Sequence, residues 1–204
     1  MATVLDISMS LDGYVAGKHD GLGHGLGDNG EPIHNWVMGG EWTSGEESFA
    51  AKGIDRELLD TMLVSAGSAI VGRRMFDVVD GWGDDPPWHL PVFVLTTRAL
   101  RPQRRGDTIF VFVADGVESA HRQAVDAAGG KNVHIGGGAS IAQQFLAAGL
   151  VDELQLHIAP LLLGSGVRLF EHLDNYPIRL EQLRVQHSEF ATHIRYRVNG
   201  ASNG

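Results

Sequence analysis

The sequence predicts an α/β fold in which a mostly parallel sheet lies between helices and an antiparallel strand pair completes the sheet. Short, continuous apolar runs at residues 69–71, 91–96 and 109–113 are separated by helical segments. This alternation is typical of parallel strands that are buried on both faces. Residues 179–186 and 192–198 instead alternate polar and apolar side chains, which indicates the antiparallel pair.

The remaining elements follow in chain order. Residues 4–9 form a first apolar, β-branched strand that runs into a turn. A helix is predicted to begin at Asp55, whose carboxylate can act as the N-cap, and to end at Gly67. Two further helices and two further strands are predicted, the helices at residues 117–128 and 140–148 and the strands at 133–135 and 154–159.

One domain accounts for residues 1–200, with residues 201–204 as a tail. Residues 17–48 form a glycine-rich, acidic insertion with nine of the 27 glycines, six acids and a single base. Loops of this length in a compact domain are usually functional or mobile, so the insertion is a candidate lid over a site. The alternative is a disordered insertion, although Trp36 and Trp42 would be unusual in a purely solvated segment.

Composition excludes several classes of protein. The chain has no cysteine, which removes disulfide frameworks, zinc ribbons, iron–sulfur clusters and thiol nucleophiles. A formal charge of -9 argues against non-specific binding to nucleic acid or an anionic membrane. No apolar run has the length of a membrane span, and the acid at position 6 does not suit a signal peptide, so a cytoplasmic protein is expected.

Ten histidines raise the question of a metal site. His19 and His24 lie in a glycine- and aspartate-rich stretch, but no helical pair of histidines four residues apart occurs, so no metal is expected. His134 and His157 fall in predicted strands and are interpreted as hydrogen-bonded core or edge residues.

The strongest chemical signal is the segment from Val133 to Ala142. A buried strand ends, three glycines follow, and a helix begins. Glycines let the backbone approach a bulky anion, and the free N–H groups of a helix N-terminus attract negative charge. The segment therefore predicts a phosphate or pyrophosphate site. The alternative is that the glycines serve only tight packing; the pattern is not GxGxxG, which disfavours an ordinary Rossmann domain.

Two other strand ends fit the same anionic ligand. Arg73 and Arg74 follow the predicted strand that ends at Gly72, and Arg98 follows the next strand. The carboxyl ends of parallel strands form the ligand crevice of an open sheet, and guanidinium groups bind two phosphate oxygens at once. The alternative is that the arginines are solvated loop charges, which applies most to Arg101, Arg104 and Arg105.

Four motifs in order resemble the dihydrofolate reductase-like superfamily. They are SLDGYVAG (residues 10–17), IVGRRMF (70–76), VFVLTTR (92–98) and GGGASIAQQFL (136–146). Residues 149–164 strengthen the similarity to the branch that contains the reductase domain of riboflavin biosynthesis. The resemblance covers nearly the whole chain outside the glycine-rich segment, and it implies a three-layer α/β/α fold.

The resemblance also implies NADPH as the cofactor. Its pyrophosphate would be wrapped by Gly136, Gly137, Gly138, Ala139, Ser140 and Ile141, with the first glycine pair joined by a cis peptide bond as in folate reductases. Its adenosine end, with the 2′-phosphate, would be surrounded by Gly72, Arg73, Arg74, Thr96, Thr97 and Arg98. The nicotinamide would be lined by Ile7, Ser8, Met9, Val15 and Ala16.

The substrate side is less defined. The resemblance makes Trp42 the preferred stacking residue, with a core role as the alternative. Asp12 could orient substrate or relay a proton, but Asp-Gly is also an ordinary turn signal. Folate reductases place an acid on the helix after the first loop, and that region offers Glu46 and Glu47 without a clear register. Gly136 stands where riboflavin enzymes carry an acid, which argues against ribosylaminopyrimidine reduction.

The leading hypothesis is an NADPH-dependent reductase of a small heterocyclic compound, pterin-like or flavin-precursor-like. The alternative is a catalytically silent nucleotide-binding module that acts as a sensor or assembly partner. A flavin-using oxidoreductase is a third, weaker hypothesis. The resemblance further implies a homodimer.

Overall fold

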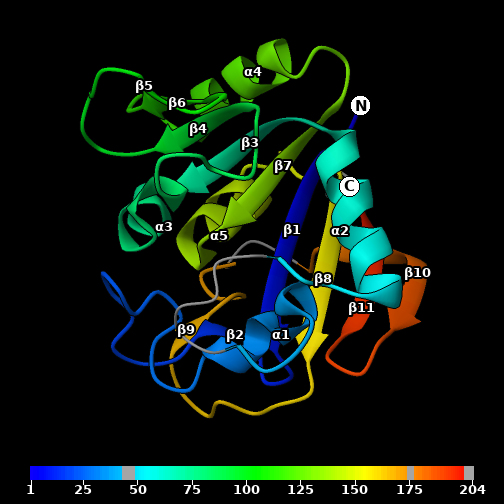
Figure 1. Cartoon of the computed structure of the whole chain (residues 1–204). Helices are drawn as coiled ribbons and strands as arrows, with labels where there is room; N and C mark the ends of the chain where they lie inside the picture. The colour runs from blue at the N-terminus through cyan, green and yellow to red at the C-terminus, as the bar shows by residue number, and fades with distance from the viewer. Residues whose placement is uncertain (43–48, 174–176, 200–204) are drawn as a thin grey trace.

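The computed structural model describes residues 1–42, 49–173 and 177–199, and Figure 1 shows how their elements are arranged. Within these residues a nine-stranded sheet has the order β10-β11-β8-β1-β7-β3-β4-β6-β5. Six strands run parallel: β1 (Thr3–Ser10), β3 (Ala66–Gly72), β4 (Pro91–Leu95), β6 (Thr108–Val113), β7 (Asn132–Gly137) and β8 (Glu153–Ala159). Three are antiparallel to their neighbours: β5 (Gln103–Arg105), β10 (Arg179–His187) and β11 (Thr192–Asn199).

Helices cover both faces of this sheet. One face packs against α4 (Val117–Ala127) and α5 (Ala139–Ala147). The other face carries the 3-10 helices η1 (Glu31–His34) and η2 (Asp80–Trp82) and the helices α1 (Asn35–Met38), α2 (Gly53–Ser65) and α3 (Arg73–Val78). The predicted three-layer fold with a mostly parallel sheet and an antiparallel C-terminal pair is therefore confirmed.

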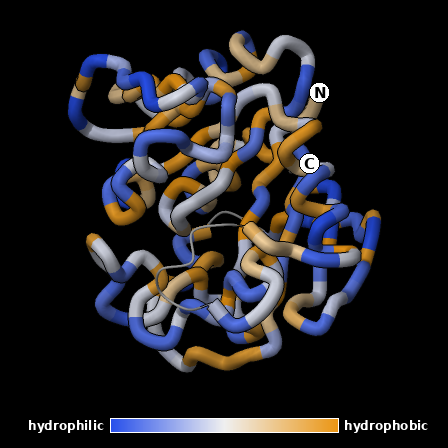
Figure 2. The backbone as a smooth tube through the Cα atoms, viewed as in Figure 1, coloured by the Kyte–Doolittle hydropathy of each residue, from blue (hydrophilic) through white to orange (hydrophobic). Residues whose placement is uncertain are grey.

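Alternation along the strands decides which side chains meet which layer. In β1, Leu5, Ile7 and Met9 join the core with α5, whereas Asp6 and Ser8 face α1 and α2. This follows from the two-residue period of a strand. Figure 2 shows hydrophobic residues concentrated along the central strands and hydrophilic residues over many outer loops.

Several predicted boundaries differ from the structure. Helix α2 begins at Gly53 with Lys52 as its N-cap residue, so the prediction that Asp55 caps it is wrong. Asp55 lies in the first turn, and its carboxylate accepts a hydrogen bond from a histidine instead of from the helix N-terminus. The helix also ends before Gly67, because β3 already begins at Ala66. The short strands β2 (Tyr14–Ala16), β5 and β9 (Val167–Arg168) were not predicted.

The described part of the glycine-rich insertion is folded. The N–H of Gly17 donates to Leu26 O at 2.7 Å, and the N–H of Asp28 donates to Lys18 O at 2.7 Å. A Cβ atom at Gly17 would lie 1.9 Å from Asp28 O, so this close backbone approach requires glycine. Residues 43–48, including Glu46 and Glu47, lie outside the described residues.

Candidate active site

The triple glycine connects β7 to α5 as predicted. Gly138 is the N-cap residue of α5, and no side chain caps the helix. The N–H groups in the first turn of a helix have no acceptor within it, so they remain available to an anion. The cis peptide bond joins Gly137 to Gly138. It therefore lies at the second glycine pair, and its expected place at the first pair, Gly136 and Gly137, is wrong for this chain.

The end of β3 lies directly against this turn. A Cβ atom at Gly72 would lie 2.8 Å from Ile141 Cγ1 and 3.6 Å from the N atom of Gly138. Gly72 also pairs with Leu95 of β4, so residues 96–98 begin at the same edge of the sheet. The carboxyl ends of the neighbouring strands β7, β3 and β4 thus lie at the same edge of the sheet (Figure 1).

The arginines at this edge have different partners. Arg73 Nε donates to Asp77 Oδ1 at 2.7 Å, and its guanidinium lies 5.7 Å from the ring centroid of Phe112. Arg74 binds Asp20 of the glycine-rich segment. Arg98 is exposed, and none of the described residues lies within hydrogen-bonding distance of its guanidinium.

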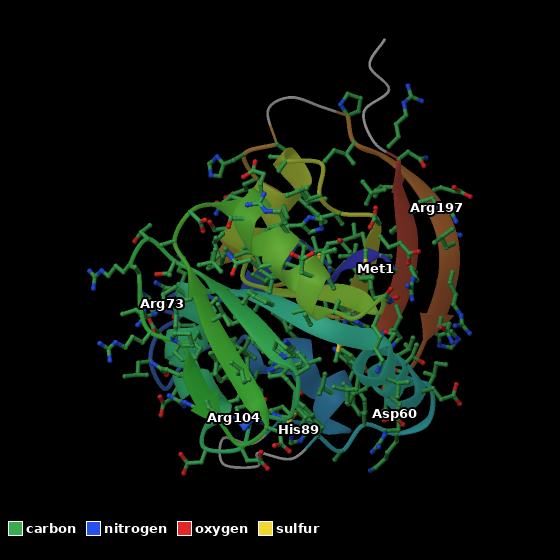
Figure 3. The ribbon with its side chains drawn as sticks, turned by 90° about the horizontal axis from the view of Figure 1, so that it is seen from above. Met1, Asp60, Arg73, His89, Arg104 and Arg197 are labelled. Carbon is green, nitrogen blue, oxygen red and sulfur yellow. The ribbon has the colours of Figure 1, made fainter. Side chains whose placement is uncertain are left out.

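The remaining residues of the two corners are also placed. The N–H of Arg98 donates to Thr96 Oγ1 at 3.2 Å, and Thr97 is exposed. Arg105 binds main-chain oxygens of Asp80 and Gly83. Arg105 is therefore a structural contact of the η2 turn, whereas Arg101 and Arg104 are exposed (Figure 3 labels Arg73 and Arg104).

The predicted nicotinamide residues are divided between the two faces of β1. Ile7 and Met9 are buried on the α5 face, and Ile7 Cδ1 would lie 3.5 Å from a Cβ atom at Gly137. Ser8 is on the opposite face, where its hydroxyl accepts a hydrogen bond from Trp36 Nε1 at 2.9 Å. Val15 and Ala16 belong to β2, which pairs with β9 near the end of β1.

Sequence reasoning missed a buried group centred on Trp36. The indole of Trp36 stacks on His157, with 4.0 Å between ring centroids and 17° between planes. His157 Nε2 donates to Asp6 Oδ1 at 2.9 Å, and His193 lies edge-on to Trp36. In the sequence, these residues are visible only as polar residues inside otherwise apolar strands. Their partners cannot be identified until the register of β1, β8 and β11 is known.

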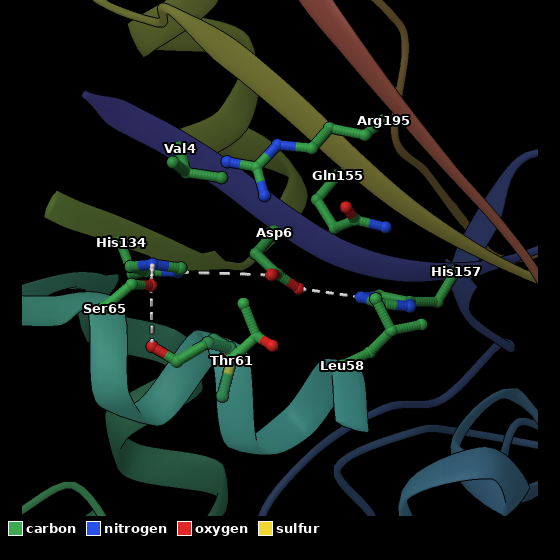
Figure 4. A pocket seen from close by; sticks show the side chains of 10 residues that line it. Val4, Asp6, Leu58, Thr61, Ser65, His134, Gln155, His157 and Arg195 are labelled. Carbon is green, nitrogen blue, oxygen red and sulfur yellow. Dashed lines mark hydrogen bonds and ion pairs between the residues drawn. The ribbon is translucent and has the colours of Figure 1, made fainter. Parts of the chain in front are cut away.

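Asp6 also borders a small cavity between the sheet and α2 (Figure 4). The cavity has a volume of about 20 Å³, which is room for roughly one water molecule. His134 Nδ1 is buried, has no hydrogen-bond partner within the described part of the chain, and lies 4.0 Å from Asp6 Oδ2. Burial opposes ionisation of Asp6, but the charge and hydrogen bond of His157 outweigh it, so the pKa of Asp6 is lowered.

Trp42 lies beside this group. The main-chain N–H of Trp42 donates to Asn35 Oδ1 at 3.1 Å, and the centroid of its ring is 6.2 Å from that of His34. The indole Nε1 of Trp42 is buried and has no hydrogen-bond partner among the described residues. A buried donor without a partner is costly and calls for an explanation, and a ligand acceptor is one. Burial first, and His157 second, lower the pKa of His34 to about 4, so this neighbouring ring is neutral at pH 7.

Asp12 is used by the turn. Its carboxylate accepts hydrogen bonds from Ser10 Oγ at 2.6 Å and from the N–H groups of Leu163 at 3.1 Å and Gly164 at 2.7 Å. The Ser10 hydroxyl, followed by the main-chain donors, lowers the pKa of Asp12 to about 2 despite some desolvation. An ionised carboxylate is no proton donor at neutral pH, so these contacts favour the turn interpretation over a proton relay.

Asp55 is the acid that the first long helix presents to the interior. It is 3% exposed and accepts a hydrogen bond from His193 Nε2 at 2.8 Å. It also lines a cavity of about 330 Å³ together with Gly39, Lys52, Gly53, Ile54, Ser188, Glu189 and Phe190. The sequence signal for Asp55 was its place in the first helical turn, which was interpreted as an N-cap.

Two findings concern the whole described part of the chain. None of its helices combines the length and apolar character that crossing a bilayer requires. No group of three or more histidine, aspartate or glutamate side chains with the arrangement of a metal site occurs within it.

Comparison with known proteins agrees with this geometry. The family model of the RibD C-terminal domain matches residues 2–193. The uncharacterized protein YyaP of Bacillus subtilis is 26% identical over 179 residues, which cover 82% of this chain and 79% of YyaP.

Two solved structures share the fold. A protein assigned to riboflavin biosynthesis in Shewanella sp. PV-4 superposes with a TM-score of 0.72 at 24% identity, covering 98% of this chain and 99% of that one. Dihydrofolate reductase from Enterococcus faecalis, solved with NADP(H), superposes with a TM-score of 0.54 at 14% identity, covering 97% and 96%. The family model covers nearly the whole chain, and both solved structures share its fold. The chain therefore belongs to the RibD C-terminal domain family.

Proposed function

We propose that this chain is an NADPH-dependent reductase that transfers a hydride to a small heterocyclic compound, pterin-like or flavin-precursor-like. The observation that carries the proposal is the meeting of Gly72, Gly138 and Ile141 at one edge of the sheet. Ile141 packs against Gly72 and holds the turn to β3, whereas a Cβ atom at Gly138 would meet no described atom outside its chain neighbours within 4 Å, so the backbone is open where a diphosphate needs close approach. Family membership and the dihydrofolate reductase fold add support.

Each part of the cofactor has residues suited to it. The unpaired N–H groups at the start of α5 would hold the pyrophosphate. The guanidinium of Arg98, which no described residue engages, would bind the 2′-phosphate, with Arg73 beside it. Ile7 and Met9 of β1 and Ala16 of β2 are buried and would exclude water around the nicotinamide. NADPH, when bound, supplies the hydride.

The substrate would lie at the carboxyl end of β1, between the nicotinamide site and Trp42. The unpartnered indole N–H of Trp42 is suited to donate to a carbonyl or ring nitrogen of a heterocycle. Asp55, a buried carboxylate on the helix after the first loop, is the acid best placed to hold ring N–H groups. Asp12 would hold the turn between β1 and β2 through Leu163 and Gly164.

Cofactor titration tests the proposal. NADPH and NADH are titrated into the protein while tryptophan emission and NADPH emission are followed. Tighter binding of NADPH is expected, and equal affinity for both would contradict the assignment of the arginines. Turnover is then measured with pterins, flavin precursors and quinones. Oxidation of NADPH supports the reductase, and saturable binding without turnover on the whole panel would favour the silent nucleotide-binding module. A yellow protein that binds added flavin would favour the flavin-using alternative.

We also propose that the chain acts as a homodimer in the cytoplasm. The edge strand β10 exposes Leu180, Leu183 and Val185, with exposed fractions of 42%, 37% and 50%. Apolar residues on an unpaired edge strand favour pairing with a second copy. A dimer mass in light scattering is expected, and a monomer at micromolar concentration would contradict this part of the proposal.

A further inference from the structure

Four titratable side chains behind Trp36 form one continuous hydrogen-bonded chain. Asp6 Oδ1 is 2.9 Å from His157 Nε2, and Asp55 Oδ1 is 2.8 Å from His193 Nε2. Between them, the Nδ1 atoms of His157 and His193 are 2.6 Å apart. Both imidazoles are 2% exposed, so water does not intervene in these contacts.

The number of protons in this chain follows from valence. An ionised carboxylate only accepts hydrogen bonds, so the contacts with Asp6 and Asp55 require N–H groups at both Nε2 atoms. The short contact between the two Nδ1 atoms requires a further proton, because two lone pairs at 2.6 Å repel each other. Two neutral imidazoles carry two protons, whereas the three contacts need three. The chain therefore holds one extra proton.

The surroundings assign this proton to His157. Burial first, and His157 second, lower the pKa of His193, so the positive charge is disfavoured on that ring. The pKa of His34, which faces His157 from η1, is lowered for the same two reasons. His157 instead has the carboxylate of Asp6 on one side and the face of Trp36 on the other, and both favour a cation.

Other charged groups face the chain through Asp6. His134 on β7 and Arg195 on β11 both lie near this carboxylate and favour its ionised form. The pKa of His134 is itself lowered, chiefly by burial, so His134 adds little positive charge at pH 7. With Asp6 ionised by these neighbours, the extra proton has no reason to leave the imidazoles for the carboxylate.

We propose that His157 is a positioning residue, which shares a stored proton with His193 and thereby holds Trp36 against Ser8 at the substrate end of the site. The proposed effect of Trp36 on hydride transfer rests on the proposed reductase activity, whereas the presence of the stored proton does not. When the proton is lost, the two Nδ1 atoms separate and the His157 ring no longer fixes the indole. At alkaline pH, Trp36 should then lose its fixed orientation, and the rate of hydride transfer should fall as a result.

The protonation state is measured by NMR on the full chain labelled with ¹⁵N-histidine. At pH 7 one buried histidine should show both ring nitrogens protonated, and a proton far downfield should couple to nitrogens of two different rings. Its assignment uses the variants His157→Gln and His193→Gln, with His121→Gln as the control. Two neutral imidazoles in the folded protein at pH 7 would overturn the proposal, whether or not NADPH binds.

The positioning role is tested by a pH profile. Protonated imidazole quenches the fluorescence of an indole in contact with it. The fluorescence of Trp36, measured as the difference between the wild type and Trp36→Phe, should therefore rise as the stored proton is lost. Asp55→Asn keeps an acceptor but removes the charge, and should shift this rise to lower pH by about one unit. Asp60→Asn makes the same change on the exposed side of α2 and should leave the profile unchanged. Identical pH profiles for the wild type, Asp55→Asn and Asp60→Asn would refute the role of His157. A failed NADPH titration would refute only the reductase proposal.

Discussion

Gly72, at the end of β3, lies so close to Ile141 in the first turn of α5 that a Cβ atom at Gly72 would be 2.8 Å from Ile141 Cγ1. The contact joins two segments that are 69 residues apart in the sequence. It fixes the glycine turn against the adjacent strand end, so the proposed pyrophosphate and adenosine sites share one rigid edge.

Gly72→Ala should therefore weaken cofactor binding. The added methyl group must displace Ile141, whose Cγ1 would lie 2.8 Å from it, and with it the first turn of α5. We expect the Kd for NADPH to rise about tenfold or more, together with a loss of about 1–3 kcal/mol in the free energy of unfolding. Isothermal titration and urea denaturation measure the two effects. Gly25→Ala is the control, since its Cβ atom would meet only ordinary contact at 3.5 Å; unchanged NADPH affinity in the Gly72 variant would contradict the pyrophosphate site at this turn.

Arg98→Ala should reduce the preference for NADPH over NADH. Loss of a charge-assisted hydrogen bond to a phosphate costs about 1.5–3 kcal/mol, or about ten- to a hundredfold in Kd. NADH affinity should stay nearly constant, because NADH has no 2′-phosphate. Arg197→Ala removes the same charge from an exposed pair with Glu181, on strands at the other end of the sheet order from β4. If both variants changed the NADPH to NADH ratio equally, Arg98 would have no specific role.

Asp20→Asn should release the glycine-rich segment from α3. Arg74 makes contacts of 2.9 Å and 2.8 Å with the Asp20 carboxylate and 2.7 Å with its carbonyl oxygen. The pair is largely exposed on the Arg74 side, so global stability should change by less than about 1 kcal/mol. Amide hydrogen exchange at residues 18–28 should accelerate while exchange in β1 stays constant. Unchanged exchange in the segment would show that its own backbone bonds suffice.

Trp42→Phe should impair turnover but not cofactor binding. The variant removes the unpartnered indole N–H and keeps an aromatic ring. We expect kcat/KM to fall about tenfold, the size of one lost hydrogen bond to substrate, with the Kd for NADPH unchanged. Trp88 is the matched control, since its buried Nε1 also lacks a partner but its ring packs on Trp82. Equal losses in both variants would indicate a packing effect.

Asp12→Asn should destabilise the protein in a pH-dependent way. The pKa of Asp12 is lowered to about 2 in the folded state, so the ionised form stabilises the fold above the unfolded-state pKa of about 4. This contribution is lost as the pH falls from about 4 to about 2. The difference in free energy of unfolding between wild type and variant should be constant from pH 7 to pH 5 and shrink below pH 4. A difference that persists unchanged to pH 2.5 would contradict the account.

The sequence was sufficient for the architecture because the strands have strong local signals. In the apolar run at residues 91–96, for example, the structure buries residues 92–95 within the sheet. The glycine connection between β7 and α5 was equally predictable, since three glycines before a helix are a local pattern. The cis bond was placed one residue too early, because nothing in a run of identical residues marks the pair that adopts it.

The substrate end could not be predicted in the same way. Asp55 is 138 residues from His193 in the chain, and only the pairing of β11 with β8 brings His193 beside His157. A buried acid in a first helical turn cannot be told from an N-cap residue in the sequence, because both stand at the start of the helix. Trp36 was noted as out of place in a solvated loop, but its stacking partner lies on a strand that is reached much later in the chain.

The most direct test of the central claim is a crystal structure of the protein with NADPH bound. The account predicts pyrophosphate density at the N–H groups of residues 138–140 and the 2′-phosphate beside Arg98. The nicotinamide should lie next to Ile7 and Met9. A cofactor bound elsewhere on the molecule, or a glycine turn closed to the pyrophosphate in the complex, would contradict it.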